Sequence, residues 1–421
     1  MIAGDHPGLM SGRATLTIDA LSTLVTGRTS ELFLPDVESH YGELKDRLDG
    51  NRILVIGGAG SIGGATVRAL LAFGPAALHV VDHNENNLVE LVRDLRSGPT
   101  GIGVKDFRAL PIDFGSPVMQ RFLREEPPYG LVLNFAALKH VRSEKDVYSL
   151  LTMLETNIVK PVRLMRWLNE KGAPYRYFCV STDKAANPVN LMGASKRIME
   201  HAVFSEEVAP NPKAYVTSAR FPNVAFSEGS LLDGFLKRLQ KHQPLALPRG
   251  ARRYFITLRE AGQICLLASV CVPHRHLLIP RMDSTRDSYD LQSIAIAVLR
   301  AHGLEPRVFQ NDREARTSVA SGLGTGHYPL VLTELDTTGE KPHEEFLGDG
   351  EKSVEVGMTR LLGVPHHPAP RGAVSGAIEK IDELIARQDR RVSKQDIVAL
   401  ISTAVPNFTH AETGKNLDEQ A

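Results

Sequence analysis

The stretch Ile53-Leu54-Val55-Ile56-Gly57-Gly58-Ala59-Gly60-Ser61-Ile62-Gly63-Gly64 decides the fold of this chain of 421 residues. The four aliphatic residues predict a buried strand, and the glycines lead into a helix predicted over residues 65–73. Gly58 and Gly60 permit a tight turn whose N–H groups can approach a pyrophosphate, and Gly63 lets the helix pack close to the strand. We therefore predict a dinucleotide site whose cofactor contacts come from Gly57, Gly58, Gly60, Ser61, Ile62 and Gly63.

Outward from this stretch, apolar strands alternate with helical segments. Residues 78–81, 107–112 and 131–137 read as strands, and this alternation predicts an α/β fold with a Rossmann-like, doubly wound parallel sheet. Asp82 follows the second strand, about 20 residues after the glycines, where an acid accepts hydrogen bonds from ribose hydroxyls. No Arg follows Asp82 until Arg93, so the pattern favours NAD over NADP. The alternative is an ordinary Asp in the turn after a strand.

Further candidates follow the third and fourth strands. Asp113, beside Phe114, could bind the adenine amino group, and the small Ala136 and Ala137 would let the backbone pass close to the cofactor. Lys139 and His140 come next and could bind substrate hydroxyls or phosphate, although a single His is more often structural. We also expect Asn157, inside a long helical pattern, to hydrogen-bond neighbouring backbone.

Acidic, basic and hydroxyl side chains are concentrated in residues 181–196, after a strand predicted over 175–180. Ligands of open α/β sheets bind at the carboxyl ends of the strands. Thr182, Asp183 and Lys184 should emerge there, and Lys196 falls in the first turns of a helix that starts near Leu191. The stretch therefore predicts an active site.

Composition excludes several classes of function. The 49 basic and 49 acidic residues balance, so nothing global indicates nucleic acid or an anionic membrane as a partner. Three cysteines without a CxxC pair fit a reducing cytosol. No secretion signal and no apolar run of ~18 residues is present, so we expect a cytoplasmic protein without a membrane span.

We expect four regions along the chain. Residues 1–50 form a helical extension for packing or oligomerisation, 51–225 the NAD-binding Rossmann domain, 226–387 a smaller α+β lobe, and 388–421 a C-terminal helix with a flexible tail. Arg252 and Arg253 form either a diphosphate clamp or part of a solvated loop. The His and acids of residues 338–345 lack a second ligand cluster at zinc spacing, so no metal is predicted.

Several motifs together resemble one family. They are GGAGSIG (57–63), NFAALKHV (134–141), STDKAANPVNLMGASK (181–196), RFPNVAFSEGS (220–230), RRYFITLREA (252–261) and TGEKPHEEF (338–346). The chain resembles the extended short-chain dehydrogenase/reductases, and among them the bacterial nucleotide-sugar 4,6-dehydratases that act on UDP-N-acetylglucosamine in surface polysaccharide biosynthesis. Met192 stands where most members carry Tyr, as in a subgroup that generally retains configuration at C5.

The resemblance implies oxidation of sugar C4 by NAD⁺, loss of water across C5 and C6, and return of hydride to C6. It also implies a homodimer or larger homo-oligomer, and a lobe that binds the nucleotide sugar. The implied substrate-binding residues are Lys139, His140, Asn223, Arg252, Arg253 and Glu344.

The family reaction implies a role for each residue of the central stretch. Lys196 would bind the nicotinamide ribose, and Thr182 would hydrogen-bond O4. Met192 carries no proton, so Asp183 is the candidate for the C4 hydroxyl proton and for protonating the C6 hydroxyl. Lys184 could take the C5 proton if its pKa falls, which desolvation and a nearby Lys196 would favour.

Three alternatives remain open from the sequence. The nucleotide could be GDP in place of UDP, the protein could be a nucleotide-sugar epimerase or reductase, or it could be a non-catalytic dinucleotide-binding protein.

Overall fold

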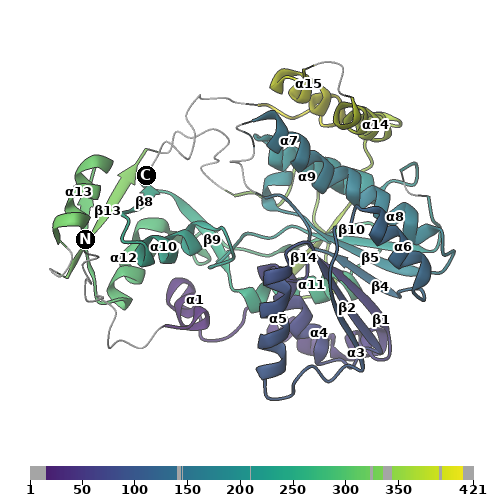
Figure 1. Ribbon diagram of the computed structural model, residues 1–421, viewed down its shortest axis with the longest axis horizontal. Coiled ribbons are helices and arrows are strands. Elements are labelled where there is room, and N and C mark those ends of the chain that lie inside the picture. Colours follow the sequence, from purple (N-terminus) through teal and green to yellow (C-terminus); the bar gives the residue numbers. More distant parts are fainter. Residues whose placement is uncertain are drawn as a thin grey trace, which may run out of the picture.

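A large twisted sheet with helices on both faces forms the body of the molecule (Figure 1). The computed structural model describes residues 16–139, 144, 146–208, 210–322, 326–334, 344–387 and 391–410. The sheet has eight strands in the order β14-β10-β6-β5-β4-β1-β2-β3, and every neighbouring pair is parallel except β10 and β14. Its strands are β1 (Arg52–Ile56), β2 (Ala77–Asp82), β3 (Asp106–Pro111), β4 (Leu131–Asn134), β5 (Tyr175–Val180), β6 (Ala214–Ala219), β10 (His276–Pro280) and β14 (Leu361–Pro365). The predicted Rossmann-like doubly wound sheet is confirmed.

Two apolar layers hold the helices against this sheet. One face carries α3 (Tyr41–Leu48), α4 (Ser61–Leu71), α5 (Glu85–Ser97) and α11 (Leu258–Val270), and the other carries α6 (Pro117–Glu125), α8 (Lys160–Asn169) and α9 (Leu191–Phe204). Helix α11 is buried over most of its circumference, as expected for a helix with few charges. Each fully buried aliphatic side chain contributes about 1.5–3 kcal/mol, so these layers supply most of the stability.

A smaller lobe is built around a second sheet. Its strands β8 (Leu245–Pro248), β13 (His327–Thr333) and β12 (Glu305–Phe309) are parallel, and its helices are α10 (Leu231–Gln240), α12 (Leu291–Ala301) and α13 (Asp312–Gly322). A short sheet of β7 (Asn223–Val224), β9 (Arg252–Ile256) and β11 (Ser288–Asp290) lies between the lobe and the large sheet (Figure 1).

The predicted lobe boundary at 226–387 needs correction. Strands β10 and β14 both belong to the large sheet, since β10 pairs with β6 and with β14. The chain therefore leaves the large domain and returns to it twice. A strand shows its apolar residues in the sequence but not its partner, and these partners are far apart along the chain.

Residues 16–50, the described part of the N-terminal segment, do not form one separate extension. Helix α1 (Ile18–Thr26) places Leu21 and Val25 in the core of the lobe, whereas α2 (Leu34–Ser39) and α3 pack against α11. Helices α2 and α3 are separated at His40. The buried Asp36 carboxylate accepts backbone N–H groups of Thr359 and Arg360 at 2.6 and 2.9 Å, which fixes α2 beside the segment that leads into β14.

The last two helices form a pair on the large domain. Helices α14 (Ala373–Ala386) and α15 (Lys394–Ala404) pack against α7 (Val147–Leu154), the π-helical turn at Glu155–Val159, and α9. The lobe predicted over 226–387 includes α14, and this part of the prediction is wrong. Figure 1 shows the pair stacked over α7 and α9, away from the lobe. Within the described residues, no helix is both long enough and apolar enough to cross a membrane.

Candidate active site

The turn after β5 brings the three predicted reactive side chains together. Ser181 continues the sheet by donating its N–H to the Ala219 carbonyl at 2.8 Å, and a short 3₁₀ turn spans Asp183–Ala185. The Thr182 hydroxyl donates to Asp183 Oδ1 at 2.7 Å. Lys184 Nζ lies 3.2 and 3.3 Å from the two Asp183 oxygens. A hydroxyl, a carboxylate and an ammonium thus meet at the carboxyl edge of the sheet, where ligands of such folds bind.

The charge state of Lys184 differs from the prediction. Burial favours a lower pKa for this ammonium, but the charges of Asp183 and Glu344 outweigh burial, and the pKa of Lys184 is raised. The predicted lowering was wrong because it considered Lys196 and desolvation but not Glu344, which is 160 positions away in the chain. Lys184 is therefore a cation in this arrangement, and its side chain is 36% exposed.

Glu344 completes this group from a distant segment. Its Oε1 accepts the Asn223 side-chain amide, its Oε2 accepts the Tyr254 N–H at 2.9 Å, and Arg253 Nε lies 3.9 Å from Oε1. Burial, and then the nearby charge of Asp183, raise the pKa of Glu344 to about 7. The structure thus brings Asn223, Arg253 and Glu344 to the predicted catalytic turn.

Arg252 does not join them. Neighbouring residues on a strand point to opposite faces, so Arg252 and Arg253 on β9 diverge. Arg252 donates to Ser288 Oγ at 3.0 Å on the exposed side, on the neighbouring strand β11. The two arginines therefore do not face one ligand as a clamp.

A network of buried ion pairs, which the sequence did not reveal, supports the turn after β5. Arg220 has no exposed surface and binds Glu200 through Nε at 2.7 Å and Glu351 through Nη1 at 2.6 Å. Ser181 donates to Glu200 at 2.6 Å, and Arg197 contacts both carboxylates. Burial opposes ionisation of Glu351, but Arg220 lowers its pKa to about 2. The RFPNV motif contained Arg220, yet only the fold shows that its guanidinium turns inward.

The same network holds the segment that carries Glu344 against the turn after β5. Arg220 Nη1 also donates to the Phe346 carbonyl at 2.9 Å. The Asn187 side chain donates to Glu345 at 3.1 Å and accepts the Asp349 N–H at 2.9 Å. A side chain at Gly348 would place its Cβ 2.4 Å from a backbone oxygen of the turn, so this approach requires glycine.

Helix α9 delivers Met192 and Lys196. Lys196 Nζ donates to the Val180 carbonyl at 2.9 Å, and burial lowers its pKa to about 8. Met192 is buried in the apolar cluster that α7, α14 and α15 share, and its N–H donates to Glu144 Oε1 at 3.0 Å. The predicted helix start near Leu191 is confirmed by the cap at Asn190, whose side chain accepts the Gly193 N–H at 2.7 Å.

Asn157 holds the backbone after β4, as predicted. Its side chain accepts the Leu138 N–H and donates to the Leu138 carbonyl, both at 2.9 Å, and also donates to Ser195 Oγ at 3.0 Å. It lies in the π-helical turn, a distortion that is frequent at functional sites. Asn157 therefore ties the strand end beside Ala136 and Ala137 to helix α9.

At the predicted cofactor site, the backbone of the glycine-rich turn at 57–63 lies close to the backbone at Ala136. Gly57 has φ +69°, and a Cβ there would lie 2.6 Å from the Ala136 nitrogen. A Cβ at Gly63 would lie 2.2 Å from the Gly57 carbonyl oxygen. Asp82 is buried, and its two oxygens accept N–H groups of Ala59 and Asn84 at 3.1 and 3.0 Å. These residues form a narrow cradle at the start of α4, which suits the pyrophosphate of a dinucleotide.

The other predicted site residues make their contacts away from the turn after β5. Asp113 binds Lys160 at 2.7 Å and the Gly115 N–H at 2.9 Å, and Phe114 is buried beside it. Ser61 Oγ accepts the Glu228 N–H at 2.8 Å, which links the glycine turn to the approach to the lobe. Lys139 is exposed, and His140 lies outside the described residues.

The sequence model of the family described as "Polysaccharide biosynthesis protein" matches residues 53–364. The chain belongs to this family. The match includes the glycine-rich turn at 57–63, the turn after β5 and the Glu344 segment, so all parts of the candidate site lie within it.

Known proteins resemble the chain to different extents. It is 30% identical over 233 residues to the capsular polysaccharide biosynthesis protein CapD of Staphylococcus aureus, covering 55% of this chain and 38% of CapD. It is 26% identical over 243 residues to an inverting UDP-N-acetylglucosamine 4,6-dehydratase of Campylobacter jejuni, covering 56% of this chain and 69% of that protein. The structure of Pen from Bacillus thuringiensis has a TM-score of 0.61 at 20% identity, covering 85% of this chain and 98% of Pen, and shows the shared fold.

Proposed function

We propose that this member of the polysaccharide biosynthesis family is an NAD-dependent nucleotide-sugar 4,6-dehydratase that acts on UDP-N-acetylglucosamine. The observation that carries the proposal is the contact of Thr182, Asp183 and Lys184 at the sheet edge next to the glycine cradle. An epimerase needs only oxidation and reduction at C4, whereas elimination of water also needs an acid and a base beyond C4. The similarity to the Campylobacter dehydratases supports the same reaction.

In this proposal, each proton transfer is assigned to a side chain of the protein. Bound NAD would supply hydride acceptance and return, held by the cradle at Gly57 and Gly63 and by Lys196. Thr182 would hydrogen-bond O4 of the sugar and stabilise the charge that develops there. Asp183 would accept the C4 hydroxyl proton and later protonate the departing C6 hydroxyl. Met192 has no proton to exchange, which leaves this role to Asp183.

Lys184 must lose its proton before it can take the C5 proton. In the paired state its pKa is raised, so we propose that the sugar separates Lys184 from Asp183 when it binds. Desolvation would then dominate and lower the pKa of Lys184. Glu344, whose pKa of about 7 lies near neutral pH, would accept the proton that Lys184 releases.

We further propose NAD over NADP as the cofactor. The Asp82 carboxylate faces the glycine turn through Ala59, so a 2′-phosphate at this position would meet a negative charge. Protein stripped of cofactor should regain activity with NAD⁺ at low concentration and not with NADP⁺ at the same concentration. Equal recovery with both cofactors would contradict this choice.

Reaction in D₂O tests the elimination directly. The proposal expects a product that has lost water and carries deuterium at C5, because C5 is protonated from solvent, and hydrogen at C6, because the hydride returns internally. Proton NMR of the product reads both positions and the C5 configuration. An epimerase would return a product that retains its C6 hydroxyl.

Two lysine variants separate catalysis from folding. Lys184→Ala should abolish deuterium incorporation at C5, and Lys241→Ala, which removes an exposed ammonium in the lobe, should leave it unchanged. Incorporation at the normal rate in Lys184→Ala would show that Lys184 is not the base.

A further inference from the structure

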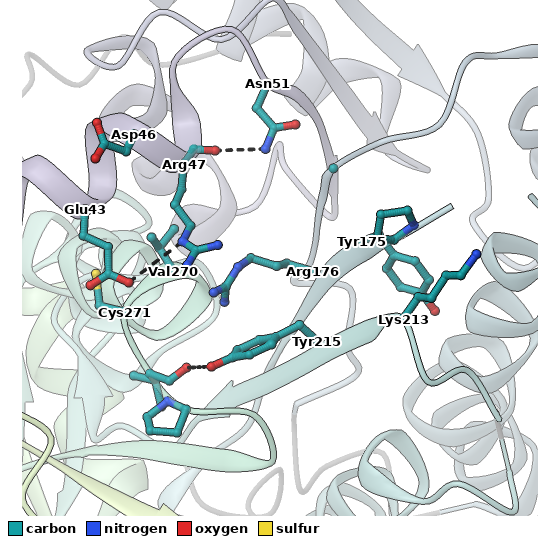
Figure 2. A pocket seen from close by; sticks show the side chains of 14 residues that line it. Glu43, Asp46, Arg47, Asn51, Tyr175, Arg176, Lys213, Tyr215, Val270 and Cys271 are labelled. Carbon is teal, nitrogen blue, oxygen red and sulfur yellow. Dashed lines mark hydrogen bonds and ion pairs between the residues drawn. The ribbon is translucent and has the colours of Figure 1, made fainter. Parts of the chain in front are cut away.

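A pocket lies at the edge of the large sheet opposite the candidate active site, where the parallel strands begin. It has a volume of about 560 Å³ and is bordered by helix α3, by the starts of β5 and β6, and by the end of α11. Figure 2 shows its charged side chains, which are Glu43, Asp46, Arg47, Arg176 and Lys213. The volume is within the range of about 300–1,000 Å³ that small-molecule sites occupy. No residue of the proposed active site lines it.

Two guanidinium groups face one another inside this pocket. Arg47 extends from α3 and Arg176 from the start of β5, and Figure 2 shows their guanidinium groups close together. Burial and then the positive charge of Arg47 lower the pKa of Arg176. Two like charges in one partly buried space repel each other, so a neighbouring anion would stabilise the arrangement.

Carboxylates of the protein neutralise this pair weakly. Glu43 Oε1 lies 3.9 Å from Arg47 Nε, and both side chains are about half exposed, so the pair contributes little. Among the described residues, Arg176 forms no ion pair, and its guanidinium donates to the Ser269 carbonyl at 3.5 Å. By contrast, the buried Arg220 binds two carboxylates at 2.6 Å. The donors of Arg176 therefore remain available on the pocket side.

Arg176 is also held in place in advance of any ligand. Its guanidinium lies 3.9 Å from the centre of the Tyr215 ring, and the Tyr215 hydroxyl donates to the Val272 carbonyl at 3.0 Å. A stacked guanidinium keeps its in-plane N–H groups free for an oxyanion. Across the pocket, Lys213 Nζ donates to the Gly172 carbonyl at 2.9 Å and retains two further N–H groups.

We infer that this pocket is a second binding site, for a small polyanion that carries carboxylate or phosphate groups. One anionic group lies between Arg47 and Arg176, and a second lies near Lys213. The site depends on helix α3, and so gives a role to the part of the N-terminal segment whose function the sequence did not show. Strand β5 runs from Arg176 to Val180, so the pocket and the turn at Ser181 lie at opposite ends of one strand, roughly 16 Å apart.

Calorimetric titration of the full chain tests the site with two probes, inorganic pyrophosphate and citrate, at constant ionic strength and with saturating NAD⁺. We expect binding of at least one probe, and Arg47→Gln and Arg176→Gln should each weaken it by about tenfold or more, the effect of losing one charge-assisted contact. A preference for pyrophosphate would assign phosphate ligands to the site, and a preference for citrate would assign carboxylates. Arg47 is half exposed on a surface helix, so its variant should fold even if Arg176→Gln does not.

Two matched variants distinguish this pocket from the rest of the protein surface and from the proposed active site. Arg300→Gln removes an exposed arginine of the lobe and should leave binding unchanged. Arg253→Gln alters the proposed nucleotide-sugar site and should also leave binding unchanged. The inference is overturned if neither probe binds, if Arg47→Gln and Arg176→Gln bind as the wild type does, or if Arg253→Gln loses the binding.

Discussion

Replacing Arg220 with methionine removes a fully buried guanidinium from between two carboxylates. The guanidinium makes five hydrogen bonds of 2.6–3.0 Å, two to Glu200, two to Glu351 and one to the Phe346 carbonyl. Methionine is apolar and of similar length, so it leaves both carboxylates buried with Arg197 as their remaining cation. Loss of one partner from a buried ion pair costs about 3–5 kcal/mol, and we expect Arg220→Met to lower the free energy of unfolding by this amount near neutral pH.

The effect should depend on pH in a defined direction. Arg220 and Arg197 hold the pKa of Glu200 below its usual value, and Arg220 holds that of Glu351 at about 2. Because the pKa of an unfolded Glu is about 4.3, this stabilisation is present above pH ~4.3 and is lost as the pH falls towards 2. In Arg220→Met the carboxylates bind protons more readily. The difference between variant and wild type should therefore shrink as the pH falls from 8 to 5.

Urea unfolding at pH 8 and pH 5, followed by tryptophan fluorescence and circular dichroism, measures these differences. Arg197→Met is the matched control, because Arg197 contacts the same two carboxylates but keeps 13% of its side chain exposed. It should cost about 1–2 kcal/mol, since Arg220 remains in place. A loss below ~1 kcal/mol in Arg220→Met, or equal losses in both variants, would refute the role given to Arg220.

Three further substitutions test the geometry of the site. Gly63→Ala places a Cβ 2.2 Å from the Gly57 oxygen and should weaken NAD⁺ binding by about tenfold or more in a fluorescence titration, while Gly64→Ala, which meets the flexible end of an arginine, should not; equal effects would contradict the packing argument. Glu344→Gln should remove an ionisation near pH 7 from the pH profile of kcat. A raised carboxyl pKa stabilises the folded protein below pH ~4.3 and this stabilisation is lost as the pH passes 7, so the variant should gain stability relative to wild type from pH 6 to pH 8. An unchanged kcat profile would remove Glu344 from the proton transfers. Asn157→Leu should lower kcat at least about tenfold with a small change in KM, because it frees the strand end without touching the substrate; wild-type kcat would show that the strand end needs no support.

Local sequence patterns predicted the large parallel sheet and placed Thr182, Asp183 and Lys184 directly after one of its strands. The glycine turn needs close backbone approaches that few other residues permit, so its pattern defines a strand, a turn and a helix together. The same holds for Thr182 to Lys184, because a strand that ends in polar residues places them at the ligand-binding edge. These predictions depend on residues close together in the chain.

Predictions that depend on distant residues were less successful. The pKa of Lys184 depends on Glu344, and the position of Glu344 depends on Arg220, Glu351 and the return of the chain into β14. No periodic pattern in the sequence shows that β10 and β14 join the large sheet, or that the Arg220 side chain points inward. Alternation along β9 could have shown that Arg252 and Arg253 point in opposite directions, had the segment been recognised as a strand.

The central claim is tested most directly by mass spectrometry of the nucleotide sugar after incubation with the purified protein. UDP-N-acetylglucosamine and GDP-N-acetylglucosamine are incubated separately, and absorbance at the wavelength of NADH is followed in parallel. The account predicts that the UDP sugar loses the mass of one water while no net NADH forms, since hydride returns to the same molecule. An unchanged mass with both sugars, or stoichiometric accumulation of NADH, would contradict a 4,6-dehydratase.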